Sequence, residues 1–270
     1  MKLPASFSFK LLGAALALCL FIGLAHAEFA VAVSPPRFVL QAKPGELLRR
    51  TIDITNAAGT ASTYAVKTAD WTYGQDGSVS FSEELSPGSC RPWVAIERRQ
   101  LTVQSGRPYR FRFEIAPPAG TVPTECRFAL LIEGQDEKAD AGGVAVPFAA
   151  RMAVIVYVGV GGVQAELSVV GTGVRMVDGL LTPVLQVQNA GTAHGRLSGF
   201  LSGTDAKQTN LDFTPADLPI LPGEVRSVPL LATRRGDADT RVAPAFPVTV
   251  KGRLEMGASA SREFEQRFER

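Results

Sequence analysis

The sequence is poor in histidine and cysteine and lacks the common catalytic motifs. Its 270 residues include only two histidines and three cysteines. There is no G-x-S-x-G element, no phosphate-binding loop and no paired metal-ligand motif. His194, in "GTAHGRL", is a lone histidine in a predicted turn, and the acids of "EELS" and "GQDEKAD" are typical of solvated loops. We therefore expect a protein that is not an enzyme and has no cofactor or metal site.

A large excess of charge of either sign is also missing. The formal net charge is +2, and both excess positive charges, Lys2 and Lys10, lie in the first ten residues. Without that segment the basic and acidic residues are equal in number. A balanced chain carries no basic face for a polyanion. The sequence therefore argues against nucleic acid or an anionic membrane surface as a partner.

The first 27 residues have the three parts of a secretory signal peptide. Lys2 and Lys10 precede an apolar run from Leu11 to Leu24, and "AHA" at 25–27 supplies an A-x-A cleavage site. We expect export to the periplasm after cleavage, with no direct insertion of the mature chain into the membrane. The alternative is an uncleaved N-terminal anchor.

Cysteine is scarce in the rest of the chain. Cys19 lies within the predicted signal peptide, which leaves Cys90 and Cys126. Two cysteines in an exported chain predict one disulfide bond. A metal site is a poor alternative because no histidine or third cysteine lies near either one.

Long segments of helical period are absent, and short alternating segments take their place. "LLRRTIDIT", "PYRFRFEIAPP" and "LTPVLQVQN" are typical, with Gly, Pro, Asn and Asp between them. This pattern predicts an all-β protein built from two immunoglobulin-like β-sandwich domains in tandem. We place the first domain at 28–160 and the second at 161–270, with the boundary in the glycine-rich segment 159–162.

Two internal echoes favour related domains. "IDITNAAGTA" (52–61) resembles "LQVQNAGTA" (185–193), and "LTVQSG" (101–106) parallels "LPILPG" (218–223) in the same order. Each echo alone could reflect the similarity of turns in general. Together they predict that one sandwich is repeated.

One apolar run, "GGVAVPFAARMAVIVYVGVG" (142–161), is long enough to span a membrane. A transmembrane helix would place Pro147 and Arg151 inside it, and both are unfavourable there. Its apolar residues instead recur with a period of two, and many are β-branched. We predict one very long strand of about 50 Å at about 3.3 Å per residue. Such an apolar strand must have its edge either covered or used.

The first half of the chain resembles the periplasmic pilus assembly chaperones, the PapD-like family of the chaperone–usher pathway. The similarity covers roughly 34–160 and depends on the order and spacing of several segments, followed by the long apolar strand. These segments are "SPPRFVL" (34–40), "IDITN" (52–56), "WVAIERRQLTVQSGRPYRFRFEI" (93–115) and "PTECRFALLIE" (123–133). The second half matches the family only as a β-domain of the right size.

The resemblance implies that the protein stabilises pilus or fimbrial subunits and works with an outer-membrane usher. In this family the long strand is donated to a subunit whose own sandwich lacks a strand. Val144, Val146 and Phe148 share one face near the start of the strand and are the donor residues that the resemblance implies. The alternative is that they belong to the domain's own core, which is what we expect for Val154, Val156 and Val158.

The resemblance also implies two basic residues that hold the subunit's terminal carboxylate. Arg37 matches the first, and Arg151 is the only basic residue of the long strand that could be the second. For either arginine, the alternative is an ion pair with an acid of the protein itself. The segment "AVIVYVGVG" departs from the lysine-rich strand of the family, which leaves room for a divergent chaperone or another client. A structural or adhesive component of a surface appendage is the competing hypothesis, and a secreted enzyme is a third.

Overall fold

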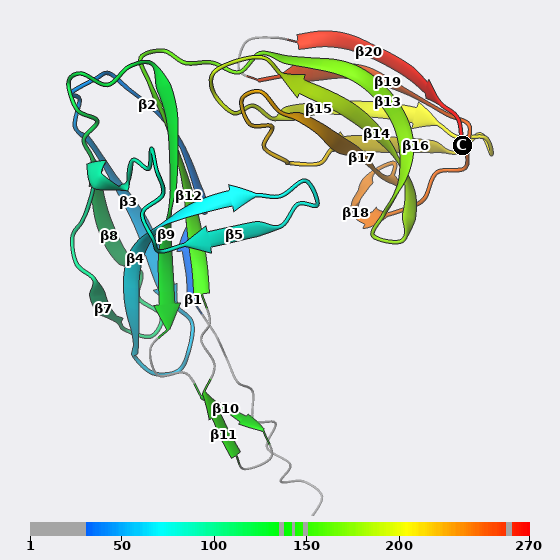
Figure 1. Ribbon diagram of the computed structural model, residues 1–270. Coiled ribbons are helices and arrows are strands. Elements are labelled where there is room, and N and C mark those ends of the chain that lie inside the picture. Colours follow the sequence, from blue (N-terminus) through cyan, green and yellow to red (C-terminus); the bar gives the residue numbers. More distant parts are fainter. Residues whose placement is uncertain (1–30, 135–137, 142–143, 148–150, 258–260) are drawn as a thin grey trace, which may run out of the picture.

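The computed structural model describes residues 31–134, 138–141, 144–147, 151–257 and 261–270. Within these ranges almost every regular element is a β-strand, and the one helical element is a short 3₁₀ turn, η2 (Arg91–Trp93). The strands form two sheet-rich units that follow one another along the chain (Figure 1). The prediction of an all-β protein with two sandwich domains is confirmed. No helix of the described chain has the length and apolar character needed to cross a membrane.

The first domain packs two sheets face to face. One has the order β1 (Val31–Ser34), β3 (Leu48–Asn56), β8 (Tyr109–Ile115) and β6 (Val94–Ile96). The other has the order β2 (Arg37–Ala42), β12 (Arg151–Val160), β9 (Thr124–Gly134), β4 (Ser62–Tyr73) and β5 (Val79–Ser82), with β7 (Gln100–Val103) beside β4.

Alternation of side chains along these strands builds the first core. Ile52 and Ile54 of β3 and Phe111 and Phe113 of β8 point inward and are fully or almost fully buried. They meet the inward row of β12, which the sequence predicted as core and which is completely buried: Val154, Val156 and Val158. That prediction is confirmed. The outward residues of the same strand form a separate, smaller cluster with β4 and β9.

The second domain is a sheet system of its own. Its strands follow the order β13 (Leu167–Val177), β14 (Leu180–Asn189), β17 (Val225–Arg234), β16 (Asn210–Pro215), β15 (Leu197–Thr204), β19 (Val248–Met256) and β20 (Ser261–Phe268), with β18 (Asp237–Arg241) beside β17. Its core runs from Leu167 to Phe268 and shares no residue with the first. The two cores separate between Val160 and Leu167. Gly161 and Gly162 lie there with φ of 77° and 78°, a conformation that favours glycine.

The two sequence echoes occupy equivalent places in the two domains. Asn56 is fully buried, and its amide nitrogen donates to the carbonyl oxygens of Thr60 and Val103 at 2.7 and 3.2 Å. Asn189, equally buried, donates in the same way to Ala193 and Ile220, both at 2.8 Å. The carbonyl oxygens of Asn56 and Asn189 accept from Gly106 and Gly223. The repeat predicted from the echoes is therefore a repeated hydrogen-bond arrangement.

The apolar run at 142–161 is not one continuous strand, and that part of the prediction is wrong. β11 (Val144–Pro147) pairs with β10 (Lys138–Ala141) in a separate two-stranded sheet, whereas β12 starts at Arg151 and lies in the main sheet. Figure 1 shows the β10–β11 pair projecting from the end of the first domain. β11 folds back on the polar segment before it. Pro147 lies in a two-stranded sheet, where each strand has an unpaired edge that tolerates a missing N–H.

Candidate functional site

One side of β12 is only partly covered. On that side β2 pairs in parallel with β12 from Ile155 to Val160, and no described strand pairs with Arg151–Val154. The N–H of Ile155 donates to the carbonyl of Pro36 at 3.1 Å, which shows that odd-numbered residues direct their backbone groups to this side. Arg151 and Ala153 have the same parity, so their backbone groups face the uncovered side. This stretch of β12 is an edge that could accept another strand.

The predicted donor residues precede this edge in the sequence. Val144 and Val146 are in β11, and Phe148 falls outside the described residues. Two of the three predicted donor residues therefore lie in one short strand, which precedes β12 in the sequence. Their donor role stays a prediction.

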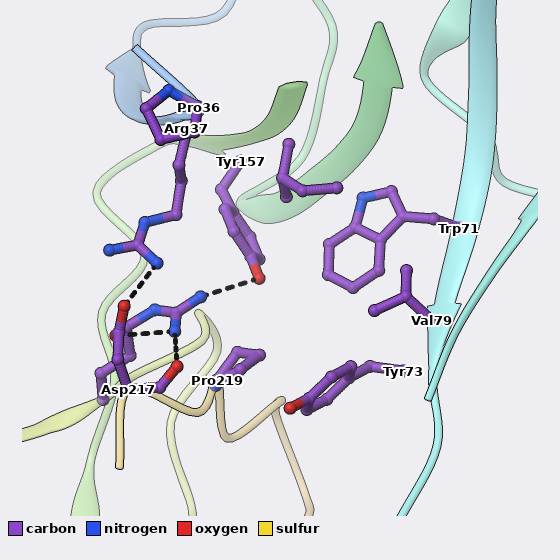
Figure 2. A pocket seen from close by; sticks show the side chains of 10 residues that line it. Pro36, Arg37, Trp71, Tyr73, Val79, Tyr157, Asp217 and Pro219 are labelled. Atoms are coloured by element: carbon purple, nitrogen blue, oxygen red, sulfur yellow. Dashed lines mark hydrogen bonds and ion pairs between the residues drawn. The ribbon is translucent and has the colours of Figure 1, made fainter. Parts of the chain in front are cut away.

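A groove of about 450 Å³ lies between the two domains. Its apolar lining comes mainly from the outer face of the first domain's sheet, where Trp71, Tyr73, Ile155 and Tyr157 lie, and Pro219 adds to it from the second domain. Figure 2 shows the rings of Trp71, Tyr73 and Tyr157 around the open space, with Asp217 at one end. The groove combines an apolar wall with one charged end.

The charged end is a carboxylate held by two arginines. Arg37 Nη1 lies 3.0 Å from Asp217 Oδ2, and Arg196 Nη1 lies 2.8 Å from Asp217 Oδ1. Burial alone would raise the pKa of Asp217. The hydrogen bond from Arg37 and the positive charge of Arg196 outweigh it and hold that pKa below its usual range. Arg37 comes from β2 and Arg196 and Asp217 come from the second domain, so the contact joins the domains.

Arg151 lies apart from this group. It is on the same face of the sheet as Ile155, the register partner of Arg37, but four residues earlier in the strand. At about 3.3 Å per residue this is about 13 Å along β12. Its guanidinium pairs with Glu133 at 2.5 Å, and Lys67 lies 3.1 Å from the same carboxylate. Burial opposes ionisation of Glu133, yet the hydrogen bond from Lys67 and the charge of Arg151 lower its pKa.

Two further polar contacts fasten the domains. His194 Nδ1 lies 2.6 Å from Glu125 Oε2, both side chains are 5% exposed, and the His194 ring stacks on Tyr157 at 3.5 Å. Arg226, which is 1% exposed, pairs with Glu224, donates to the Gly74 carbonyl at 2.9 Å and lies over the Tyr73 ring. The orientation of the groove walls therefore depends on buried polar contacts.

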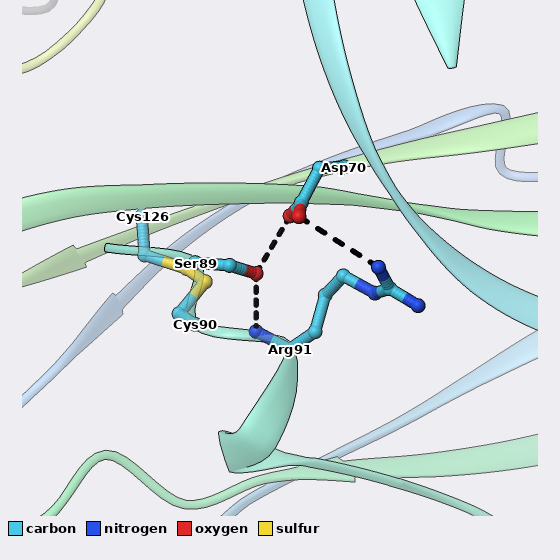
Figure 3. Close-up of a disulfide and its surroundings, with 5 residues drawn as sticks. All are labelled: Asp70, Ser89, Cys90, Arg91 and Cys126. Atoms are coloured by element: carbon cyan, nitrogen blue, oxygen red, sulfur yellow. Dashed lines mark hydrogen bonds and ion pairs between the residues drawn. A yellow bond between two sulfur atoms is a disulfide. The ribbon is translucent and has the colours of Figure 1, made fainter. Parts of the chain in front are cut away.

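The predicted disulfide is present in the first domain. Cys90 and Cys126 are bonded, with their Cα atoms 6.0 Å apart, within the usual range for a disulfide. The bond ties the loop before η2 to β9. Figure 3 shows Asp70 beside it, bound to Ser89 and facing Arg91. The loop that follows β5 is thus held against the sheet that carries the groove.

The sequence did not single out Arg196, Asp217, Trp71 or Glu125. Arg196 lies in "NAGTAHGRLSG" and Asp217 directly precedes "LPILPG", so both adjoin segments quoted for the internal echoes. No cluster of metal-ligating side chains occurs in the residues that the structure describes.

No family model matches the chain, and no curated protein matches it. Among solved structures, the Pseudomonas aeruginosa CupB2 chaperone is similar, with 11% identity and a TM-score of 0.46 over 88% of this chain and 100% of that one. The Salmonella enterica SafB chaperone, in complex with the SafA pilin, has 13% identity and a TM-score of 0.46 over 88% of this chain and 97% of that one. The Acinetobacter baumannii CsuC–CsuE chaperone–tip subunit complex has 14% identity and a TM-score of 0.43 over 88% of this chain and 98% of that one.

Proposed function

We propose that the protein is a periplasmic chaperone that binds pilus or fimbrial subunits and completes their sandwich with the uncovered edge of β12 and the β11 segment before it. The observation that carries the proposal is the edge at Arg151–Val154, an apolar strand edge without a described partner. Soluble proteins protect such edges because they template pairing with other chains. A client that lacks one strand of its own sheet would cover it.

The groove supports the same proposal. Arg37 lies beside the strand that would be donated and already holds a carboxylate. A terminal carboxylate fixed there would set the register of the added strand, and a slip of one residue would turn every side chain to the wrong face. Arg151, the other predicted anchor, lies at the start of the edge and would meet the client earlier in the strand. The sequence resemblance supplies the class of client and the outer-membrane usher as a further partner.

The sharpest test removes one backbone hydrogen bond from the edge. Ala153→Pro deletes an N–H that faces the uncovered side and leaves the bonds between β12 and β9 in place. We expect this variant to fold and to lose recovery of a co-expressed pilus subunit that lacks its last strand. Ala153→Ser, which keeps the N–H, should retain recovery. Equal recovery with both variants would contradict strand addition at this edge.

Charges in the donor segment give a second test. Val146→Asp or Phe148→Asp would place an unpaired charge in the client's core, which costs several kcal/mol. We expect loss of the complex and an unchanged unfolding transition of the free protein. If the free protein unfolds instead, these residues belong to its own core and the donor assignment is wrong.

A further inference from the structure

The carboxylate site between the domains is occupied by the protein's own Asp217. Building on the proposed function, we propose that Asp217 is an internal placeholder that the C-terminal carboxylate of the client displaces. In this exchange Arg37 and Arg196, one from each domain, are the two arms of the site. The client that fits best ends in an apolar residue.

The geometry already matches carboxylate recognition. Each oxygen of Asp217 receives one arginine, Arg37 on Oδ2 and Arg196 on Oδ1. Arg196 would keep its position after an exchange, because it also donates to the Asp217 backbone carbonyl at 2.8 Å and to the Tyr157 hydroxyl at 3.4 Å. Its Nε is buried and has no described partner, so a further donor is available.

Asp217 is held loosely enough to leave. Its side chain is 64% exposed and lies between β16 and β17, outside both strands. Ion pairs that include a solvent-exposed side chain contribute little to stability, although Arg196, at 18% exposed, is the more buried of the two arginines. A client strand already paired with β12 would present its terminal carboxylate at high effective concentration, which favours the exchange.

The walls of the groove determine which kind of side chain the client's C-terminal residue should carry. Across the open space from the arginines the lining is apolar and includes Trp71, Tyr73 and Val79, and Pro219 lies between the two sides (Figure 2). Trp71 is only 5% exposed, and its indole N–H is buried without a described acceptor. An apolar terminal residue would cover this wall. A short polar side chain would leave the wall uncovered.

The first experiment measures whether Asp217 competes with an added carboxylate. The probe is a fluorescent peptide of alternating valine and serine ending in phenylalanine, made as the free acid and as the amide, with binding followed by anisotropy. Asp217→Asn should bind the free acid roughly 3- to 10-fold more tightly than the wild type, and the amide unchanged. Asp53→Asn, which removes an exposed acid paired with Arg110, is the matched control and should change neither. Unchanged or weaker binding of the free acid by Asp217→Asn overturns the placeholder.

The second experiment tests the arm from the second domain. The wild type should prefer the free acid to the amide, and Arg196→Ala should bind both equally. Arg253→Ala, which removes an exposed arginine of the same domain, should keep the preference. A preference that survives Arg196→Ala overturns its assignment. A serine-terminated free acid that binds as tightly as the phenylalanine-terminated one overturns the apolar terminus.

These outcomes separate the inference from the proposed function. If both peptides bind the wild type equally and Asp217→Asn changes nothing, strand addition stands and the placeholder is wrong. If neither peptide binds the wild type or Asp217→Asn, both proposals are wrong.

Discussion

The last strands of the two domains protect their edges in different ways. β20, "SREFEQRF", pairs only with β19 in the described chain, and half of its residues are charged. β12, "RMAVIVYVGV", has a single charged residue, and β2 covers it from Ile155 onward. Charged side chains make a strand edge a poor template for pairing, whereas apolar ones make it a good template. The second domain thus protects its edge with the charged side chains of β20. The first protects most of its edge with a strand, and no strand of the described residues pairs with Arg151–Val154 on that side.

The largest expected difference between β12 and β20 is in the free energy of unfolding after a charge is placed on the inward face of each strand. Val156→Asp places an unpaired carboxylate at a fully buried position of β12 and should cost about 3–5 kcal/mol or more. Gln266→Asp, at a half-buried position of β20, should cost only about 1 kcal/mol. Denaturant unfolding of the two variants measures both values. Similar losses in the two would contradict the view that only β12 supplies a central row of its core.

Removal of the disulfide should have the next largest effect, and it should destabilise one domain and not the other. Cys90 and Cys126 are 36 residues apart, and closing a loop of that length stabilises the fold by about 3–4 kcal/mol in chain entropy. Cys90→Ser combined with Cys126→Ser should lower the unfolding midpoint of the first domain only. Domain-specific hydrogen exchange would locate the loss. An equal loss of protection in the second domain would mean that the domains unfold as one unit.

The buried asparagines test what the domains share. Asn56→Ala and Asn189→Ala each leave two carbonyl groups and at least one N–H group without their partner; both carbonyls are buried at Asn189, whereas at Asn56 the Val103 carbonyl is buried and Thr60 is exposed. Each should cost about 2–4 kcal/mol in its own domain, because a buried unsatisfied group costs about 1–3 kcal/mol. Hydrogen exchange on both variants should give matching losses. A loss of protection with only one of the two variants would mean that the asparagine hydrogen bonds stabilise only one of the two domains.

The sequence was sufficient for features with a local signal. Alternation gave the strands and the inward row of β12, and "IDITN" and "LQVQN" gave the repeat because each asparagine closes its turn within a few residues. It was not sufficient for the division between β11 and β12. The period of two runs through 144–160 unbroken, and a period carries no information on which strand pairs with which.

The site was predictable in part for the same reason. Arg37 was found because it lies within a recognisable segment of the first strand. Its partner Asp217 is 180 residues away, and only the packing of one domain on the other brings them together. Glu125 and His194 also meet across that joint. No pattern along the chain encodes such a contact.

Acid should weaken the joint slightly. The pKa of Asp217 is lowered in the folded protein, so its contribution is complete above its unfolded pKa of about 3.9 and is lost as the pH falls through the folded value. Because the side chain is exposed, the effect should not exceed about 1 kcal/mol. The difference in unfolding free energy between wild type and Asp217→Asn should be constant from pH 7 to about pH 4 and shrink below. A constant difference down to pH 2 would contradict the ion pair.

The smallest effect on stability, and the most direct test of the comparison, is to give β20 the character of β12. Glu263 and Glu265 lie exposed on the outer face of β20. Glu263→Val with Glu265→Val should change the free energy of unfolding by less than about 0.5 kcal/mol, since neither side chain is buried. It should nevertheless raise self-association in light scattering, because an apolar edge strand templates pairing with a second copy. Glu263→Lys with Glu265→Lys keeps the edge charged and should behave as the wild type does. If the valine variant associates no more than the lysine variant, charge does not protect β20, and the uncovered stretch of β12 loses its explanation as an edge left open for a partner.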